Sequence, residues 1–161
     1  MRFLAKLFGT FLYYIGAPVS GNAIPLREVN DPAFAAGLLG KGIAIEPAEG
    51  NIYAPCNARV DMLFDTAHAL TLISEHGTEI LIHIGLDTVN LKGAHYKAHV
   101  KNGDHVKKGQ LLIEFDLQAI KNAGYDTITP VVICNSDQYR TISTHTGKPV
   151  IAGESVIKVS K

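Results

Sequence analysis

The chain has 161 residues, a length that suits one domain with a sizeable hydrophobic core. Its 15 basic and 15 acidic residues give a formal net charge of zero at pH 7, and neither end carries a run of like charges. Because domains that bind nucleic acid usually carry a basic excess, the composition predicts no nucleic-acid partner.

The first 16 residues differ from the rest of the chain. Their apolar side chains recur at helical spacing: Phe3, Leu4, Leu7, Phe8, Phe11, Leu12 and Ile15. With Arg2 and Lys6 as basic residues, residues 1–15 could bind an anionic membrane surface, or could instead pack on the domain or be disordered. The segment is too short to span a bilayer and lacks a clear signal-peptide cleavage site. We expect a separate segment over 1–16 and one folded domain over 17–161.

Short apolar runs separated by Gly, Pro, Asn and Asp follow as far as residue 159. This pattern is typical of an all-β antiparallel sandwich or barrel. It predicts strands over residues 42–45, 52–54, 59–64, 70–73, 79–84, 110–115, 131–134 and 155–159. Two stretches, 31–39 and 117–123, favour short helical turns.

One predicted hairpin carries two histidines. His83 lies in its second strand, and His68 precedes its first, with turn-forming residues 74–78 between the strands. A two- or four-residue loop centred on Glu75 and His76 would place His68 directly opposite His83, about 5 Å away between Cβ atoms. A two-residue turn one position later would make the histidines diagonal neighbours on one face, whereas an odd-length loop or a bulge would separate them. We expect a facing pair.

The residues alone leave three interpretations of this pair open. The histidines could be hydrogen-bonded core residues, as buried polar groups commonly are. They could bind zinc, although two ligands make an incomplete site and no third ligand is visible nearby. They could transfer phosphoryl groups, because one neutral imidazole can attack phosphorus while its neighbour donates a hydrogen bond to the phosphoryl oxygens.

Motifs along most of the chain resemble one family. The segment from His83 to Val89, followed by Leu91-Lys92-Gly93, is similar to the active-site segment of the glucose-family enzyme IIA (EIIA) components of the bacterial sugar phosphotransferase system. Further motifs match in the family's order and spacing: Ala17-Pro18-Val19-Ser20-Gly21, Gly42-Ile43-Ala44-Ile45-Glu46-Pro47, Ala54-Pro55, Glu114-Phe115-Asp116-Leu117 and Thr129-Pro130-Val131-Val132-Ile133. The resemblance covers residues 17 to 158 and implies a β-sandwich of the duplicated-hybrid-motif kind.

The resemblance implies roles for individual residues. His83 matches the histidine that accepts the phosphoryl group, His68 the histidine that stabilises the phosphorylated form, and Thr66 the hydroxyl residue that orients His68. Gly85 is expected to give backbone room or an amide beside the phosphate. A docking rim for partner proteins is expected from Asp31, Phe34, Leu38, Leu39, Asp87 and Val89.

The same resemblance implies the partners and the activity. The donor would be the phosphocarrier protein HPr and the acceptor the EIIB domain of a sugar permease, which places the chain in the cytoplasm, at the inner face of the membrane. The activity would be a phosphotransferase reaction through a phosphohistidine, with no cofactor. The sequence contains no nucleotide-binding loop of the G-x-x-x-x-G-K type, which favours a protein donor over ATP.

Two other functions are weighed against this one. A regulatory protein could bind partners in a phosphorylation-dependent way, with a zinc ion shared at His68 and His83. A zinc hydrolase of a related β fold would need an H-x-H ligand pair, which the sequence lacks. The transported sugar stays open among glucose, N-acetylglucosamine, trehalose and β-glucosides.

Overall fold

The computed structural model describes residues 11–161, and nearly all of its regular structure is strand. The strands are β1 (Leu12–Gly16), β2 (Gly21–Pro25), β3 (Lys41–Pro47), β4 (Asn51–Tyr53), β5 (Ala58–Leu63), β6 (Ala69–Ser74), β7 (Glu79–His83), β8 (Tyr96–Ala98), β9 (His105–Val106), β10 (Leu111–Phe115), β11 (Thr129–Ile133), β12 (Thr141–Thr144), β13 (Lys148–Val150) and β14 (Ser155–Ser160). The helical pieces are η1 (Leu26–Glu28), α2 (Pro32–Ala35), η2 (Thr88–Leu91), α3 (Leu117–Asn122) and η3 (Ser136–Gln138). Among the described residues, none of these helices could cross a membrane.

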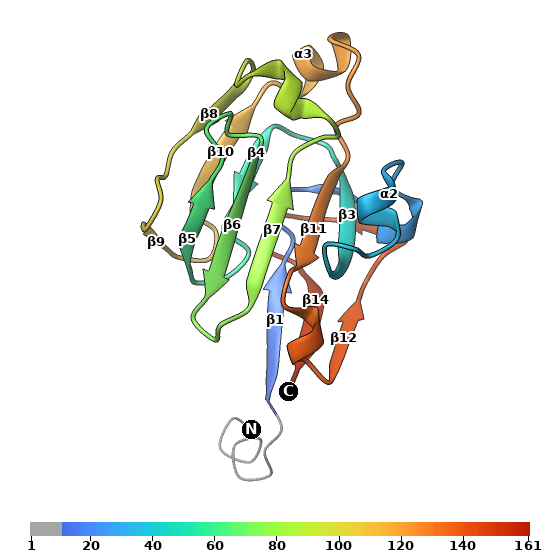
Figure 1. The fold of residues 1–161 in the computed structure, drawn as a ribbon, viewed down its shortest axis with the longest axis vertical. Helices are drawn as coiled ribbons and strands as arrows, with labels where there is room; N and C mark the ends of the chain where they lie inside the picture. The colour runs from blue at the N-terminus through green and yellow to red at the C-terminus, as the bar shows by residue number, and fades with distance from the viewer. Residues whose placement is uncertain (1–10) are drawn as a thin grey trace.

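The strands form three antiparallel sheets (Figure 1). The largest has the order β13-β2-β3-β11-β7-β6-β5-β9, and two three-stranded sheets have the orders β1-β14-β12 and β4-β10-β8. The predicted antiparallel β-sandwich is confirmed, but no sheet within residues 11–161 closes on itself, so the barrel alternative is wrong.

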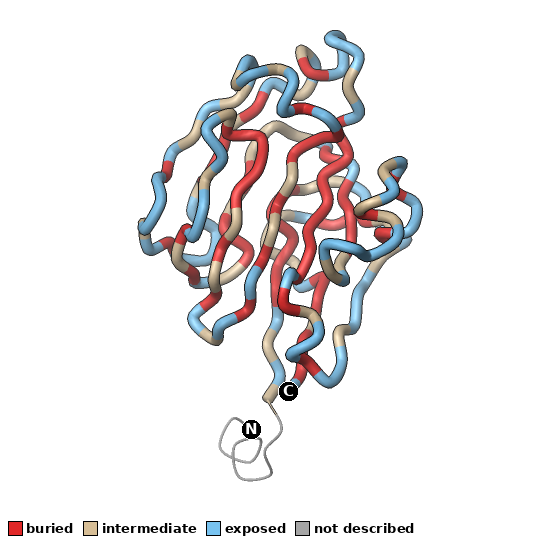
Figure 2. Tube along the Cα trace, in the orientation of Figure 1, coloured by how far each residue is buried: buried red, intermediate tan, exposed pale blue. Residues whose placement is uncertain are grey.

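The large sheet packs apolar side chains on both faces. Figure 2 shows β11, near the centre of this sheet, buried along its length. Ile80 and Ile82 of β7 point into the main core, and each contributes roughly 2–3 kcal/mol by leaving water. Because side chains alternate along a strand, Leu81 faces the other way. There it packs on a smaller cluster formed by Leu26, Val29, Phe34, Ala44, Leu86, Ile128 and Val132. His83 is two residues beyond Leu81, so it shares the face of this second cluster.

All eight predicted strands are present, with ends that differ by a few residues. The predicted helical turns are also present but shorter, as α2 and α3. The strands that the sequence did not predict are β1, β2, β8, β9, β12 and β13. Each of these lies at or next to a sheet edge, where few aliphatic residues are needed.

The prediction for residues 1–16 is wrong at its carboxyl end. Residues 12–16 are not helical: they form β1, which pairs with β14 from Leu12 opposite Ser160 to Ile15 opposite Ile157. Pairing with β14 and burial of Ile15 outweigh the weak helical periodicity of the segment. The domain therefore begins before residue 17. The rest of the predicted amphipathic segment, residues 1–10, lies outside the described residues.

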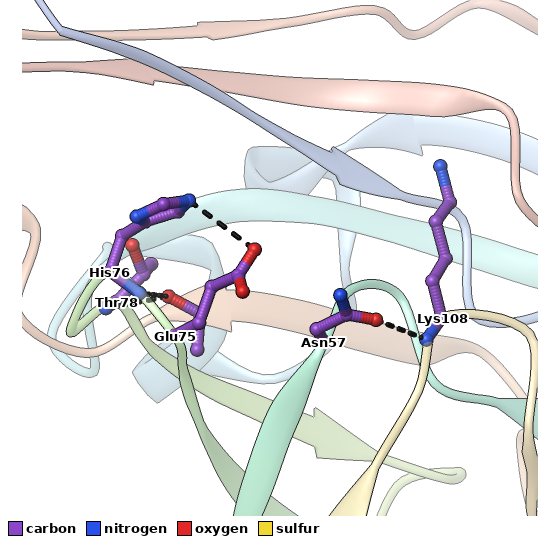
Figure 3. Close-up of polar contacts among 6 residues, drawn as sticks. Asn57, Glu75, His76, Thr78 and Lys108 are labelled. Carbon is purple, nitrogen blue, oxygen red and sulfur yellow. Dashed lines mark hydrogen bonds and ion pairs between the residues drawn. The ribbon is translucent and has the colours of Figure 1, made fainter.

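The predicted register of the β6–β7 hairpin is also wrong. Ser74 and Thr78 close the turn through a backbone hydrogen bond of 2.8 Å, which leaves an odd loop of three residues, 75–77. His76 and Thr78, labelled in Figure 3, donate their amides to the hydroxyl of Ser74 across this turn. Gly77 takes the left-handed conformation that such a loop requires. As a result Ala69, not His68, lies opposite His83.

Candidate phosphoryl-transfer site

His83 ends β7 and is tied to the main chain two residues later. Its Nδ1 lies 2.7 Å from the carbonyl oxygen of Gly85. A carbonyl can only accept, so Nδ1 carries the proton and the lone pair of the neutral ring is on Nε2. The ring also packs edge-on against Phe34, with centroids 5.3 Å apart. One nitrogen of His83 is thus committed to the backbone and the other is available for chemistry.

Gly85 can supply this carbonyl because it has no side chain. Its φ is +87°, in the region that favours glycine, and a Cβ there would meet Cγ2 of Thr88 at 2.5 Å and the carbonyl oxygen of Asp126 at 2.9 Å. The Gly85 amide donates to the carbonyl of Ile128 at 3.0 Å. That amide is therefore already paired, so of the two roles expected for Gly85 this geometry favours backbone room over an amide beside the phosphate.

His68 lies in the turn before β6 and is only 2% exposed. Thr66 is hydrogen-bonded through its hydroxyl to Nδ1 of His68. The preceding residue, Ala67, has a φ of +55°, an uncommon conformation for a residue with a side chain. Because of this bend, the side chain of His68 does not follow the alternation of side chains along β6. The register of the sheet therefore does not determine which way its ring points.

The two rings meet despite the register. Their centroids are 5.0 Å apart and their planes are 83° from parallel, an edge-to-face contact. The carbonyl of His68 accepts the amide of Ile84 at 2.7 Å, which extends the hairpin beyond the last paired residues of β6 and β7. The bend at Ala67 and the end of β7 together bring the imidazoles to one place.

Burial keeps both imidazoles neutral near pH 7. Burial, with a smaller contribution from His83, lowers the pKa of His68 to about 4. Burial also lowers the pKa of His83, while the Gly85 carbonyl and the carboxylates of Asp31 and Asp87 act in the opposite direction. A neutral imidazole keeps the lone pair that a nucleophile needs.

The predicted docking rim divides into buried and exposed members. Phe34 is buried in the second cluster, where it supports His83 and offers little surface to a partner. Leu38 is 76% exposed, Val89 50% and Leu39 41%. Asp31 caps α2 by accepting the amides of Ala33 and Phe34, and Asp87 is exposed with a φ of +59°. The exposed part of the rim is thus apolar with acidic edges.

Three residues around the site were not predicted from the sequence. Phe64 packs edge-on against His68, with ring centroids 5.4 Å apart. Thr88 and Tyr96 donate hydroxyl hydrogen bonds to the carbonyl of Ile84. Phe64 could have been found as an aromatic residue four positions before His68, but nothing in the sequence relates Tyr96 to the histidines.

In the described part of the chain, His68 and His83 do not form a complete metal site with their neighbours. Within residues 11–161, no group of three or more His, Cys, Asp or Glu side chains is placed to hold a metal ion. Zinc requires about four ligands, so an ion bound at His68 and His83 would take further ligands from another molecule.

Comparison with known proteins identifies the family and agrees with the fold. The family model of the phosphoenolpyruvate-dependent sugar phosphotransferase system, EIIA 1, matches residues 13–139. The structure is similar to that of the glucose permease IIA from Mycoplasma capricolum, with a TM-score of 0.84 and 32% identity over 92% of this chain and 96% of that one.

Curated relatives are of two lengths. The chain is 45% identical to the glucose-specific EIIA component of Oceanobacillus iheyensis over 88% of this chain and 86% of that protein. It is 52% identical to the beta-glucoside-specific EIIBCA component of Bacillus subtilis (strain 168) over 78% of this chain, but spans only 20% of that longer protein. The chain belongs to the EIIA 1 family of the phosphoenolpyruvate-dependent sugar phosphotransferase system.

Proposed function

We propose that this protein is a phosphohistidine carrier that accepts a phosphoryl group on Nε2 of His83 and passes it to another protein. The observation that carries this proposal is the hydrogen bond from Nδ1 of His83 to the Gly85 carbonyl, because it leaves the lone pair on Nε2 of a neutral ring. The family membership gives the direction of transfer: the phosphoryl group comes from phosphoenolpyruvate and ends on a sugar.

The transfer needs no proton shuttle at the nucleophile. As the Nε2 lone pair forms a bond to phosphorus, the bond between phosphorus and the donor atom breaks, and its electron pair leaves with the donor. Nδ1 keeps its proton, so the ring gains positive charge. The Gly85 carbonyl, Asp31 and Asp87, which raise the pKa of His83, stabilise that charge.

His68 serves in this proposal as the group that binds the phosphoryl oxygens. This role requires the Thr66 hydroxyl to donate to Nδ1 of His68, because the proton of the neutral ring is then on Nε2, where the N–H can donate to a phosphoryl oxygen. With a pKa of about 4, His68 stays neutral at pH 7, and its lone pair, on Nδ1, accepts from Thr66 and is not free to attack phosphorus. The buried His68 and the Phe34 ring that packs on half-buried His83 also limit the access of water to the phosphohistidine.

The partners follow from the exposed rim. Leu38, Leu39 and Val89 offer apolar surface, and Asp31 and Asp87 place carboxylates at its edge. Such a surface suits partners with an apolar contact patch flanked by basic groups, and we assign HPr as the donor and the EIIB domain of a sugar permease as the acceptor. Since the permease lies in the membrane, we place the protein in the cytoplasm, at the inner membrane face, with residues 1–10 as the segment to test for membrane contact.

A direct experiment tests the proposal. The purified protein is incubated with phosphoenolpyruvate, enzyme I and HPr, and intact mass is measured after quenching in base. We expect a gain of one phosphoryl group that is stable to base and labile to acid, and none in His83→Ala. A phosphorylated histidine in His83→Ala would contradict the assignment of the nucleophile.

Metal analysis of the same preparation tests the regulatory alternative. Stoichiometric zinc in the isolated protein, lost in both His83→Ala and His68→Ala, would favour a metal-bridged binding role. Zinc that is retained only in a complex with a partner would fit the incomplete ligand set of the described residues.

A further inference from the structure

The peptide unit between Ile84 and Gly85 is held at both ends. Its carbonyl, on Ile84, accepts the hydroxyl of Thr88 at 2.7 Å and the phenol of Tyr96 at 2.8 Å. Its amide, on Gly85, donates to the carbonyl of Ile128 at 3.0 Å. Three hydrogen bonds therefore fix one peptide plane directly after the nucleophile.

The next peptide unit contains the carbonyl that contacts the nucleophile. Its carbonyl is the Gly85 oxygen that accepts from Nδ1 of His83, and its amide, on Leu86, donates to the carbonyl of Asp126 at 2.9 Å. Glycine has wide access to both signs of φ, so Gly85 alone would not hold this carbonyl toward the imidazole. The orientation has to come from the neighbouring contacts.

Thr88 and Tyr96 are suited to such a task. Thr88 is fully buried and starts η2, while Tyr96 reaches the loop from the start of β8. Burial raises the pKa of the Tyr96 phenol, so the hydroxyl remains a donor at physiological pH. Both hydroxyls converge on one carbonyl, although neither residue touches the imidazole through any hydrogen bond found in residues 11–161.

We propose that Thr88 and Tyr96 are positioning residues that hold the Ile84 carbonyl, aim the Gly85 carbonyl at Nδ1 of His83, and so keep the lone pair of His83 on Nε2. The inference rests on the proposed function in taking His83 as the nucleophile, and it adds the residues that set the tautomer of that nucleophile. Neither the family match nor the sequence pattern assigns them this role.

The test measures the tautomer and the reaction separately. Nitrogen-15 NMR of the unphosphorylated protein reports which nitrogen of His83 carries the proton, and single-turnover phosphorylation by phospho-HPr reports the rate. In Tyr96→Phe and in Thr88→Val we expect part of the His83 population to carry the proton on Nε2, and the rate to fall roughly two- to tenfold, the effect of one hydrogen bond. The double variant of Thr88→Val and Tyr96→Phe should show a larger change in both the tautomer population and the rate. Thr88→Ser should restore the wild-type tautomer.

Tyr139→Phe is the matched control. The phenol of Tyr139 makes a buried hydrogen bond of 2.6 Å with Thr78, so its loss carries a similar stability cost without touching the loop after β7. We expect an unchanged His83 tautomer in this variant. The proposal fails if the double variant keeps a pure Nδ1–H tautomer, or if Tyr139→Phe shifts the tautomer as much as Tyr96→Phe does. Failure of the wild-type protein to accept phosphate would instead refute the proposed function, and the tautomer comparison would still stand.

Discussion

The ring of His68 lies edge to face on the ring of His83, with centroids 5.0 Å apart, although the residue opposite His83 in the sheet is Ala69. The two imidazoles differ in what holds them. A backbone carbonyl fixes Nδ1 of His83, whereas the hydroxyl of Thr66 contacts Nδ1 of His68. Because a carbonyl can only accept and a hydroxyl can also donate, the rings can carry their protons on different nitrogens.

Substitution of His68 separates acceptance from onward transfer. In His68→Gln we expect His83 still to be phosphorylated, but transfer to an EIIB domain to slow by about 100-fold, because the amide of glutamine does not hold an N–H at the position of the ring Nε2–H. Rapid-quench measurement of both steps checks this. His105→Gln, at an exposed histidine in β9, is the control and should transfer normally. Undiminished transfer by His68→Gln would remove His68 from the mechanism.

Thr66 should act through the orientation of His68. In Thr66→Ala we expect onward transfer to slow by roughly fivefold, since one hydrogen bond to the ring is lost. Thr66→Ser keeps the hydroxyl and should restore the rate. If Thr66→Ser is as slow as Thr66→Ala, then the methyl group and not the hydroxyl is what the site requires.

Stability should fall in mild acid because of His68. The pKa of this residue drops from 6.5 to about 4 on folding, so the unfolded chain binds a proton first as the pH decreases. The contribution of neutral His68 to the free energy of unfolding is therefore complete above about pH 6.5 and is lost as the pH falls towards about 4. Its size is about 1–3 kcal/mol.

Urea unfolding at pH 7 and pH 4.5 measures this loss. His68→Gln lacks the titrating group, so its free energy of unfolding should change less between the two pH values than that of the wild type. An equal change in both proteins would show that other groups, and not His68, determine the acid sensitivity.

Gly85→Ala should destabilise the protein and block phosphorylation. The new Cβ would meet Thr88 at 2.5 Å and the Asp126 carbonyl at 2.9 Å, in addition to the strain of a φ of +87°. We expect a loss of roughly 2–4 kcal/mol, measured by thermal and urea unfolding. Gly103→Ala is the control, because Gly103 has a φ of +88° but open space around it, and should lose only about 1 kcal/mol. Similar losses in both variants would mean that φ alone, without steric contact, accounts for the effect.

Charge on the exposed rim should weaken partner binding without changing the chemistry. For Leu38→Glu and Val89→Glu we expect the KM for phospho-HPr to rise roughly tenfold at constant kcat, as for loss of a moderate interface contact. Ile151→Glu, in the turn between β13 and β14, is a control of matched exposure: 72% against 76% for Leu38. A kcat decrease with unchanged KM would place the rim residues in the reaction instead of in docking.

The sequence predicted the strands that bury the most apolar surface and missed the ones that bury little. β7 and β11 are nearly continuous aliphatic runs, which only a central strand requires. β2, with the sequence Gly-Asn-Ala-Ile-Pro, has no such run and is specified by pairing with β3. Local composition carries the first kind of information, and long-range pairing carries the second.

The functional site shows the same division between local and long-range information. His68 and His83 could be recognised from residue type, and their partners Thr66 and Gly85 from the family resemblance. The register could not, because it depends on whether Ser74 closes a loop of two, three or four residues. Tyr96 could not be found either, since its contact with Ile84 spans 12 residues and a change of sheet.

The pairing of β1 with β14 has an architectural consequence. Leu12 lies opposite Ser160, so the first described strand and the last leave the fold side by side, while the carboxyl end of β7 with His83 points away from them (Figure 1). A neighbouring module attached next to Leu12 or Ser160 would thus be held at the end of the sandwich away from His83. The same domain could in this way work as an independent shuttle or as one part of a longer polypeptide.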